Sequence, residues 1–174
     1  MTFLGYALFL LLMLFVGTYA FGGLSAAPWL PLWKKDVNRM LSLAQIKEGE
    51  IVCDLGAGDA RLLITAALDY KAKGLGFEVA ILPYLIGCIK IYIKGLNNRI
   101  IFKFSNFFSQ NIAQADVICL FLTPAGMEKL KPKLEKETKK GVRILSYAFI
   151  IKGWEPKCVD DSMPNRGKIY LYQR

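Results

Sequence analysis

The stretch that decides the fold is IVCDLGAGDAR, residues 51–61. Its first five residues form a short apolar run, which is typical of a strand buried on both faces of a parallel sheet. Gly56 and Gly58 then allow a tight turn that brings backbone N–H groups close to a ligand, at the N-terminus of the helix expected over 59–71. The stretch therefore predicts a strand–loop–helix unit that binds a nucleoside cofactor, with a turn in a non-binding α/β protein as the alternative.

Strand and helix patterns alternate on both sides of this unit. Further strands are expected at 73–78, 99–104, 116–122 and 142–149, and further helices over 37–46, 80–95 and 125–139. Such alternation predicts a Rossmann-like α/β fold, with a parallel sheet, right-handed crossovers and helices on both faces. The turn signals at 163–167, followed by KIYLY, predict an antiparallel hairpin that closes the sheet at its C-terminal end.

The residues after the glycine loop select the cofactor. Glu78 ends the next strand, where a carboxylate accepts hydrogen bonds from the two hydroxyls of a ribose. Arg61 stands where a dinucleotide site needs a third glycine for close helix–strand packing. S-adenosylmethionine has no pyrophosphate and does not demand that glycine, and Asp54 suits its cationic methionine end. We therefore predict S-adenosylmethionine rather than NAD.

The composition excludes several kinds of chemistry. The chain has no histidine, which rules out Ser-His-Asp and Cys-His nucleophilic systems and removes the commonest zinc ligand. Its cysteines are scattered and form no CxxC pair, at positions Cys53, Cys88, Cys119 and Cys158. They are predicted to be buried thiols in a reducing compartment, and no metal site is expected.

The N-terminal residues differ from the rest of the chain. Residues 1–33 carry no charged side chain, so the net charge of +9 belongs entirely to 34–174. A helix over 3–24 would span ~33 Å, enough to cross a hydrocarbon core of ~30 Å. We predict a transmembrane anchor with its exit segment over 1–33 and one catalytic domain over 34–174. A cleavable signal peptide and a buried core helix are the competing interpretations.

Charge predicts how such an anchor would be oriented. Lys34, Lys35 and Arg39 follow the apolar stretch, and no basic side chain precedes it. The positive-inside bias then places the domain on the cytoplasmic side of a single-pass protein, or on the matrix side in a mitochondrion. Trp29 and Trp33 fit an interfacial belt at the membrane exit, and they fit a lid over the active site equally well.

Several motifs together resemble one family. They are the proline-bounded entry after Pro28, the D-L-G-x-G-D motif at 54–59, G-x-E at 76–78 and W-x-P at 154–156. Over nearly the whole chain after Pro28 they resemble the class I, seven-strand S-adenosylmethionine-dependent methyltransferases. The similarity is greatest to the small membrane-associated protein-lysine methyltransferases of the ATP synthase c-subunit and the adenine nucleotide translocase, and to their prokaryotic relatives.

The resemblance implies roles for particular residues. It places the methionine end of the cofactor against the loop residues Asp54, Gly56, Ala57 and Gly58. It also places the ribose against Glu78, and the adenine against Asn106 and Phe107, although Phe107 could equally be an ordinary core aromatic.

Two positions depart from the family pattern. Asn106 replaces an acid, and Ala60 replaces a glycine. If residue 60 needs a positive φ, Ala60 costs ~1 kcal/mol of loop stability. These departures leave a catalytically decayed cofactor-binding protein as one alternative.

The acceptor must arrive at the carboxyl edge of the sheet, where Thr123 and Pro124 follow a strand. Thr123 could position an amine there, but capping the next helix is the stronger interpretation. The resemblance and the anchor favour a lysine of a membrane or membrane-proximal protein. A lipid, quinone or other apolar acceptor would instead need a deep apolar pocket near Trp29, Trp33 and Trp154. The basic helix over 125–140 is interpreted as a solvated face, and no nucleic acid partner is expected.

Overall fold

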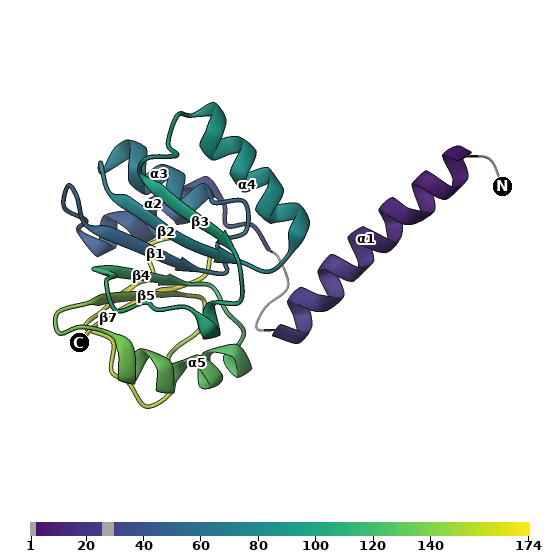
Figure 1. Cartoon of the computed structure of the whole chain (residues 1–174). Helices are drawn as coiled ribbons and strands as arrows, with labels where there is room; N and C mark the ends of the chain where they lie inside the picture. Colours follow the sequence, from purple (N-terminus) through teal and green to yellow (C-terminus); the bar gives the residue numbers. More distant parts are fainter. Residues whose placement is uncertain (1–2, 26–29) are drawn as a thin grey trace.

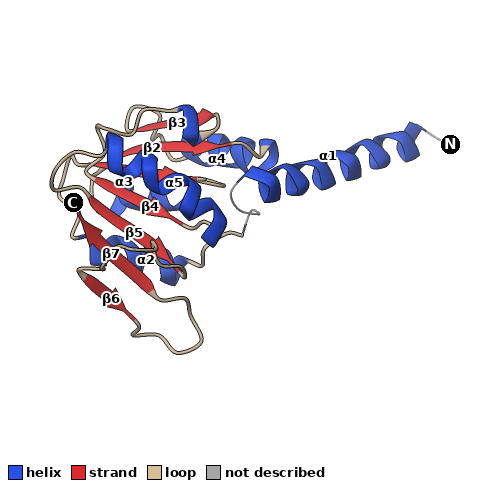
Figure 2. Cartoon of the chain, turned by 90° about the horizontal axis from the view of Figure 1, so that it is seen from below, coloured by secondary structure: helices blue, strands red, loops and turns tan. Residues whose placement is uncertain are grey.

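The computed structural model describes residues 3–25 and 30–174, and these form a seven-stranded sheet in the order β3-β2-β1-β4-β5-β7-β6 (Figures 1 and 2). The strands are β1 (Ile51–Leu55), β2 (Lys73–Glu78), β3 (Ile100–Phe104), β4 (Val117–Leu120), β5 (Arg143–Tyr147), β6 (Cys158–Asp160) and β7 (Ile169–Gln173). The helices are α1 (Phe3–Ser25), α2 (Lys34–Ala44), α3 (Arg61–Asp69), α4 (Ile81–Ile93), α5 (Pro124–Glu137) and the short 3₁₀ helix η1 (Phe107–Ser109).

The strand directions confirm the predicted fold class. Strands β1 to β5 pair in parallel, whereas β7 pairs antiparallel with both β5 and β6. From β1, strands β2 and β3 are added on one side of the sheet and β4 and β5 on the other, so the strand order changes direction between β1 and β4. The carboxyl ends of these two strands therefore border a crevice of the kind in which α/β proteins bind ligands. The predicted elements are all present, and η1 is an addition that the sequence pattern did not predict.

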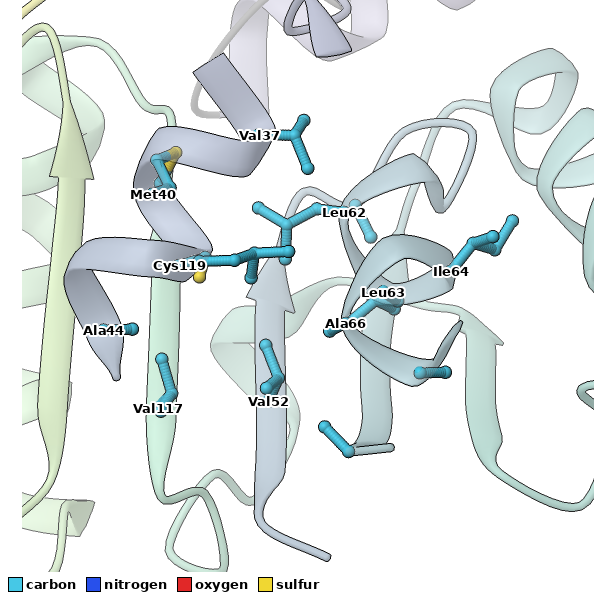
Figure 3. Close-up of a cluster of buried hydrophobic side chains, with 14 of the residues drawn as sticks. Val37, Met40, Ala44, Val52, Leu62, Leu63, Ile64, Ala66, Val117 and Cys119 are labelled. Carbon is cyan, nitrogen blue, oxygen red and sulfur yellow. The ribbon is translucent and has the colours of Figure 1, made fainter. Parts of the chain in front are cut away.

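Helices cover both faces of the sheet. Side chains of α2 and α3 pack on one face against β1 and β4, as the cluster around Val52 and Cys119 shows (Figure 3). The face of α4 that carries Ile91 joins the same layer. Apolar residues of α5 and η1, including Met127 and Phe107, fill the opposite face. The sheet is therefore buried on both sides, which explains why β1 and β4 read as continuous apolar runs.

Residues at the start of α5 and at the end of α2 explain where these two helices begin and end. Helix α5 begins where the Thr123 hydroxyl accepts a hydrogen bond from Gly126 N (3.2 Å), with Pro124 at the first helical position. Helix α2 ends at Gln45, which adopts the left-handed conformation (φ 49°) in place of the usual glycine. Thr123 thus has the capping role that was the stronger interpretation of its position.

The N-terminal helix is present, as α1 (Phe3–Ser25), and it contacts α4. None of the helices built from described residues combines the length and the apolar character needed to cross a membrane, so the predicted transmembrane span is not supported. Trp29 lies outside the described residues, and the interpretation of that residue stays a prediction.

The cysteines are only partly as predicted. Cys53 and Cys119 are buried in β1 and β4, but Cys88 is half-buried and Cys158 is exposed on β6. The prediction of four buried thiols was therefore wrong for Cys158, because β6 is the outer strand of the sheet and covers nothing with that side chain. Within 3–25 and 30–174, no cluster of His, Cys, Asp and Glu could hold a metal ion.

Candidate functional site

The glycine loop between β1 and α3 adopts a conformation that few residues can follow. Gly56, Gly58 and Ala60 all have positive φ, at 91°, 56° and 59°. The amides of Gly56 and Ala57 both donate to Phe77 O, at 3.1 and 2.9 Å, which ties the loop to the end of β2. The loop is therefore held as a fixed turn at the carboxyl edge of the sheet, and the assignment of Ala57 to the cofactor stays a prediction.

Glu78 links this loop to the start of α4. Its Oε2 accepts from Gly58 N at 2.7 Å, and its Oε1 accepts from Val79 N at 2.8 Å and Ala80 N at 2.7 Å. The residue is 7% exposed. The carboxylate is held in one orientation at the end of β2, where the ribose hydroxyls of a nucleoside are recognised in this fold.

Asp54 lies beneath the loop near the end of β1. It is buried, and no described residue forms a hydrogen bond with its carboxylate. Burial, followed by the charges of Glu78 and Asp59, raises the pKa of Asp54 to about 7. A buried carboxylate that no described group pairs suits a cationic ligand, because such a ligand supplies the missing charge. The chemistry of this donor therefore fits the methionine end of S-adenosylmethionine.

Asp59 has a role that the sequence interpretation missed. Its carboxylate accepts from Arg61 Nε and Nη2, both at 2.7 Å, and from Lys90 Nζ at 2.5 Å. Burial alone would raise the pKa of Asp59, but these two cations lower it. Arg61 also donates from Nη1 to Leu32 O at 2.6 Å. The acid of the D-L-G-x-G-D motif thus joins the loop to α3, α4 and the segment before α2.

The adenine side of the site follows β3. Asn106 is exposed, and its Oδ1 accepts from Phe108 N at 3.0 Å, which caps η1. The oxygen of the side-chain amide is therefore used in the cap, and only its NH₂ group is left to meet a ligand. Ser105 Oγ beside it is buried and has no hydrogen-bond partner among the described residues. Phe107 points into the core beneath α5, which agrees with its alternative interpretation as a core aromatic.

The structure brings most of the predicted residues together. Asp54 and the glycine loop follow β1, Glu78 ends β2 and Asn106 follows β3, and these strands are neighbours in the sheet. Thr123 and Pro124 follow β4 on the other side of β1. The roles in cofactor binding remain predictions, but the positions agree with one elongated site along the carboxyl edge.

The two described tryptophans do not share a pocket. Trp33 precedes α2, and the Arg166 guanidinium lies 5.3 Å from the centre of its ring. Trp154 packs in the α5 layer on the other face of the sheet, with its ring 5.8 Å from that of Tyr172. The apolar pocket expected for a lipid acceptor was placed near Trp29, Trp33 and Trp154, and the two of these that the structure describes adjoin opposite faces of the sheet.

We predict that Ala60→Gly stabilises the protein. A left-handed conformation destabilises a residue with a Cβ by ~1–2 kcal/mol, and glycine avoids this strain. Glycine also makes the unfolded chain more flexible, which offsets roughly half of the gain. The free energy of unfolding, measured by urea denaturation, should rise by ~0.5–1 kcal/mol. Ala57→Gly is the matched control, because Ala57 lies in the same loop without a positive φ and should lose stability. A lower stability for Ala60→Gly would contradict the argument.

Comparison with known proteins gives a consistent picture. A family model described as the ANTKMT methyltransferase domain matches residues 54–158. A protein-lysine N-methyltransferase of Saccharolobus islandicus is 40% identical over 149 residues, which are 83% of this chain and 92% of that protein. The adenine nucleotide translocase lysine N-methyltransferase of Mus musculus is 25% identical over 134 residues, 76% of this chain. The lysine N-methyltransferase of the ATP synthase c-subunit from Rattus norvegicus is 29% identical over 133 residues, 74% of this chain.

The match to the mammalian proteins is partial, since the chain spans 57% and 59% of their lengths. Among solved structures, an RNA methyltransferase from Salinibacter ruber in complex with S-adenosyl-L-homocysteine superimposes with a TM-score of 0.79 at 29% identity. That match covers 83% of this chain and 93% of the other. These findings confirm the resemblance that the motifs of the sequence indicated.

Proposed function

Because the chain belongs to the ANTKMT methyltransferase domain family and its methyl donor is S-adenosylmethionine, we propose that its acceptor is the side chain of a lysine in a membrane or membrane-proximal protein. The observation that carries the proposal is the match to the Saccharolobus islandicus lysine methyltransferase, which extends over nearly the full length of that protein. The names of the mammalian relatives support a membrane protein as the acceptor.

We assign the cofactor residues as follows. Asp54 would face the cationic methionine end, the backbone of Gly56 and Gly58 would allow close approach of the ligand, and Glu78 would bind the ribose. Asn106 would meet the adenine through its free amide group. S-adenosylmethionine, when bound, supplies an activated methyl group on a sulfonium. The protein's own contribution is to hold donor and acceptor in line and to exclude water, for which neither a metal nor a histidine is needed.

The acceptor would enter beside the loop that joins β4 to α5. A lysine can act as a nucleophile only as the neutral amine, so the site must favour loss of its proton. Phe121 directly follows β4, and its ring meets that of Tyr147, the last residue of β5, edge-on at 4.9 Å. Aromatic rings at this edge would desolvate an incoming amine and lower its pKa.

We also propose that residues 1–33 attach the domain, residues 34–174, to a membrane. Helix α1 carries no charged residue, and Phe3, Leu4 and Leu10 on it are 91%, 68% and 66% exposed. Exposed apolar side chains of this kind need a covering that water cannot provide. The basic residues that follow α1 favour a domain on the cytoplasmic or matrix side.

A second acceptor class is RNA, which the likeness to the Salinibacter ruber RNA methyltransferase and the net charge of +9 favour. A lipid acceptor has less support, since Trp33 and Trp154 are on different faces of the sheet. The decayed-protein alternative would follow from weak cofactor binding through Ala60 and Asn106.

The test is a methylation assay on the full-length chain. Radiolabelled S-adenosylmethionine would be offered together with membrane proteins, soluble proteins, RNA and extracted lipids, and the labelled fraction identified. Label in membrane protein, found as methyl-lysine by mass spectrometry and absent with Glu78→Ala, would support the proposal. Label confined to RNA or lipid would replace it. No label in any fraction, from a chain that binds the cofactor, would reject all three acceptors.

A further inference from the structure

One face of α4 exposes a continuous apolar stripe. It consists of Ile81, Leu85, Ile89, Tyr92 and Ile93, hereafter the α4 stripe, which are 39%, 49%, 57%, 75% and 75% exposed. Residues spaced by three, four and seven positions lie on one side of a helix. These exposures hold with α1 in place, although α1 contacts α4. The α4 stripe is therefore an apolar surface that the described part of the chain leaves open.

The opposite face of α4 explains why the stripe cannot turn inward. Pro83, Gly87 and Ile91 are buried against the sheet. A Cβ on Gly87 would come within 2.5 Å of the Phe102 ring, so helix and strand are in close contact there. Tyr84, one turn earlier on α4, also packs on β3, with its ring centre 4.9 Å from that of Phe102 and 5.4 Å from that of Phe104. The orientation of α4 is thus set by tight packing, and exposure of the stripe is a fixed feature of the fold.

The chain segment that contains the stripe carries charged residues of one sign. Between Glu78 and Asp116 the sequence contains no acidic residue, although it contains four basic ones. Lys90 is neutralised by Asp59, but Lys94, Arg99 and Lys103 are exposed. An apolar helical face flanked by cations, with a tyrosine among its most exposed residues, is typical of a helix that lies in a membrane interface.

We propose that the α4 stripe rests on the surface of an anionic lipid bilayer. Pairing with a second copy through α4 would bring together two segments, residues 79–115 of each chain, that contain basic residues and no acid to neutralise them. Anionic headgroups neutralise such cations. Figures 1 and 2 show α1 projecting from the side of the domain on which α4 lies, so an apolar N-terminal helix and the stripe would meet the same membrane.

This contact would place the cofactor loop close to the lipid surface. Lys90 on α4 donates a hydrogen bond from Nζ to Asp59 Oδ2 of the glycine loop, at 2.5 Å. This ion pair connects the helix that carries the stripe directly to the cofactor loop. The carboxyl ends of β2 and β3 would then lie near the headgroups, where a membrane-proximal acceptor presents its lysine. The proposal itself concerns only how the domain sits on a bilayer, and it holds for any acceptor.

The test measures where α4 lies when the full chain is mixed with vesicles. A fluorescent label would be attached at Ile89→Cys, or at Lys129→Cys as the control on exposed α5, in a Cys88→Ser, Cys158→Ser background that keeps the two buried cysteines. The vesicles would contain phosphatidylcholine and phosphatidylglycerol with a nitroxide-labelled lipid as quencher. We expect the label at 89 to be quenched by the nitroxide lipid and the label at 129 to remain unquenched. Leu85→Glu combined with Ile93→Glu should remove most of that quenching, whereas Val159→Glu on β6, 43% exposed in the wild type, should not.

Two results would overturn the proposal. Equal quenching at 89 and 129, whether or not the chain binds the vesicles, would show that the stripe does not touch lipid. A label at 89 that is shielded from water without lipid quenching, in a manner that depends on protein concentration, would assign the stripe to a second copy of the chain. Neither result involves methylation, so the proposed function would stand or fall separately.

Discussion

Replacing Glu78 with alanine is expected to abolish measurable binding of S-adenosylmethionine. The carboxylate holds three backbone amides, those of Gly58, Val79 and Ala80, and in our assignment it also binds both ribose hydroxyls. A hydrogen bond to a charged group contributes ~1.5–3 kcal/mol, so loss of the two ribose bonds alone predicts at least a ~100-fold weaker affinity. Calorimetric titration of the full-length chain measures this directly.

A conservative variant separates binding from folding. Glu78→Gln keeps the shape of the side chain and one acceptor oxygen, so it should retain the loop and show an intermediate loss of affinity. Asp69→Ala, at the exposed end of α3, is the matched control and should bind as the wild type does. A folded Glu78→Ala protein, verified by circular dichroism, that bound with wild-type affinity would remove Glu78 from the site.

The second large effect concerns Asp54 and pH. Its folded pKa of about 7 lies above the ordinary value of 3.8. Between these pH values the folded state therefore holds a proton that the unfolded state has lost, and stability falls as pH rises from ~4 to ~7. The difference of about three pKa units corresponds to an upper bound of ~4 kcal/mol for this group. Asp54→Asn should remove this loss and raise the melting temperature of the ligand-free protein at pH 8.

The same substitution should impair function. A cationic ligand favours the ionised carboxylate, so affinity for S-adenosylmethionine should increase by up to ~10-fold per pH unit below pH ~7 and level off above it. Asp54→Asn should bind weakly at every pH, without this dependence. The comparison of the two pH profiles isolates Asp54 from all other titrating groups. Identical pH profiles of stability for wild type and variant would contradict the argument.

Some residues of the site could be predicted from the sequence pattern of one strand, its loop and the next strand. Asp54, Gly56, Gly58 and Glu78 were predicted because a parallel strand, its loop and the end of the next strand must lie side by side in this fold. The pairing of Leu55 with Phe77 at the ends of β1 and β2 puts them there. The positive φ of residue 60, 59°, could likewise be anticipated, because the family pattern has a glycine where this chain has Ala60.

Other features depend on contacts between distant parts of the chain. Asp59 and Lys90 are 31 residues apart, and their bond exists only because α3 and α4 pack on the same face of the sheet. Phe107 belongs to the core cluster on the α5 face of the sheet. The sequence pattern could not predict on which side of the sheet a loop aromatic would fall, because a loop has no periodicity.

By itself, the sequence determined the fold class, the cofactor and the order of the elements. The fold class and the order of the elements follow from hydrophobic periodicity and turn chemistry, and the cofactor follows from the glycine loop with Arg61 and Glu78. The tertiary structure alone decided that Asp59 binds Arg61 and Lys90, that Trp33 and Trp154 lie on opposite faces, and that one side of α4 stays open. The physical reason is that burial and ion pairing depend on which elements pack together, and packing is a property of the whole chain.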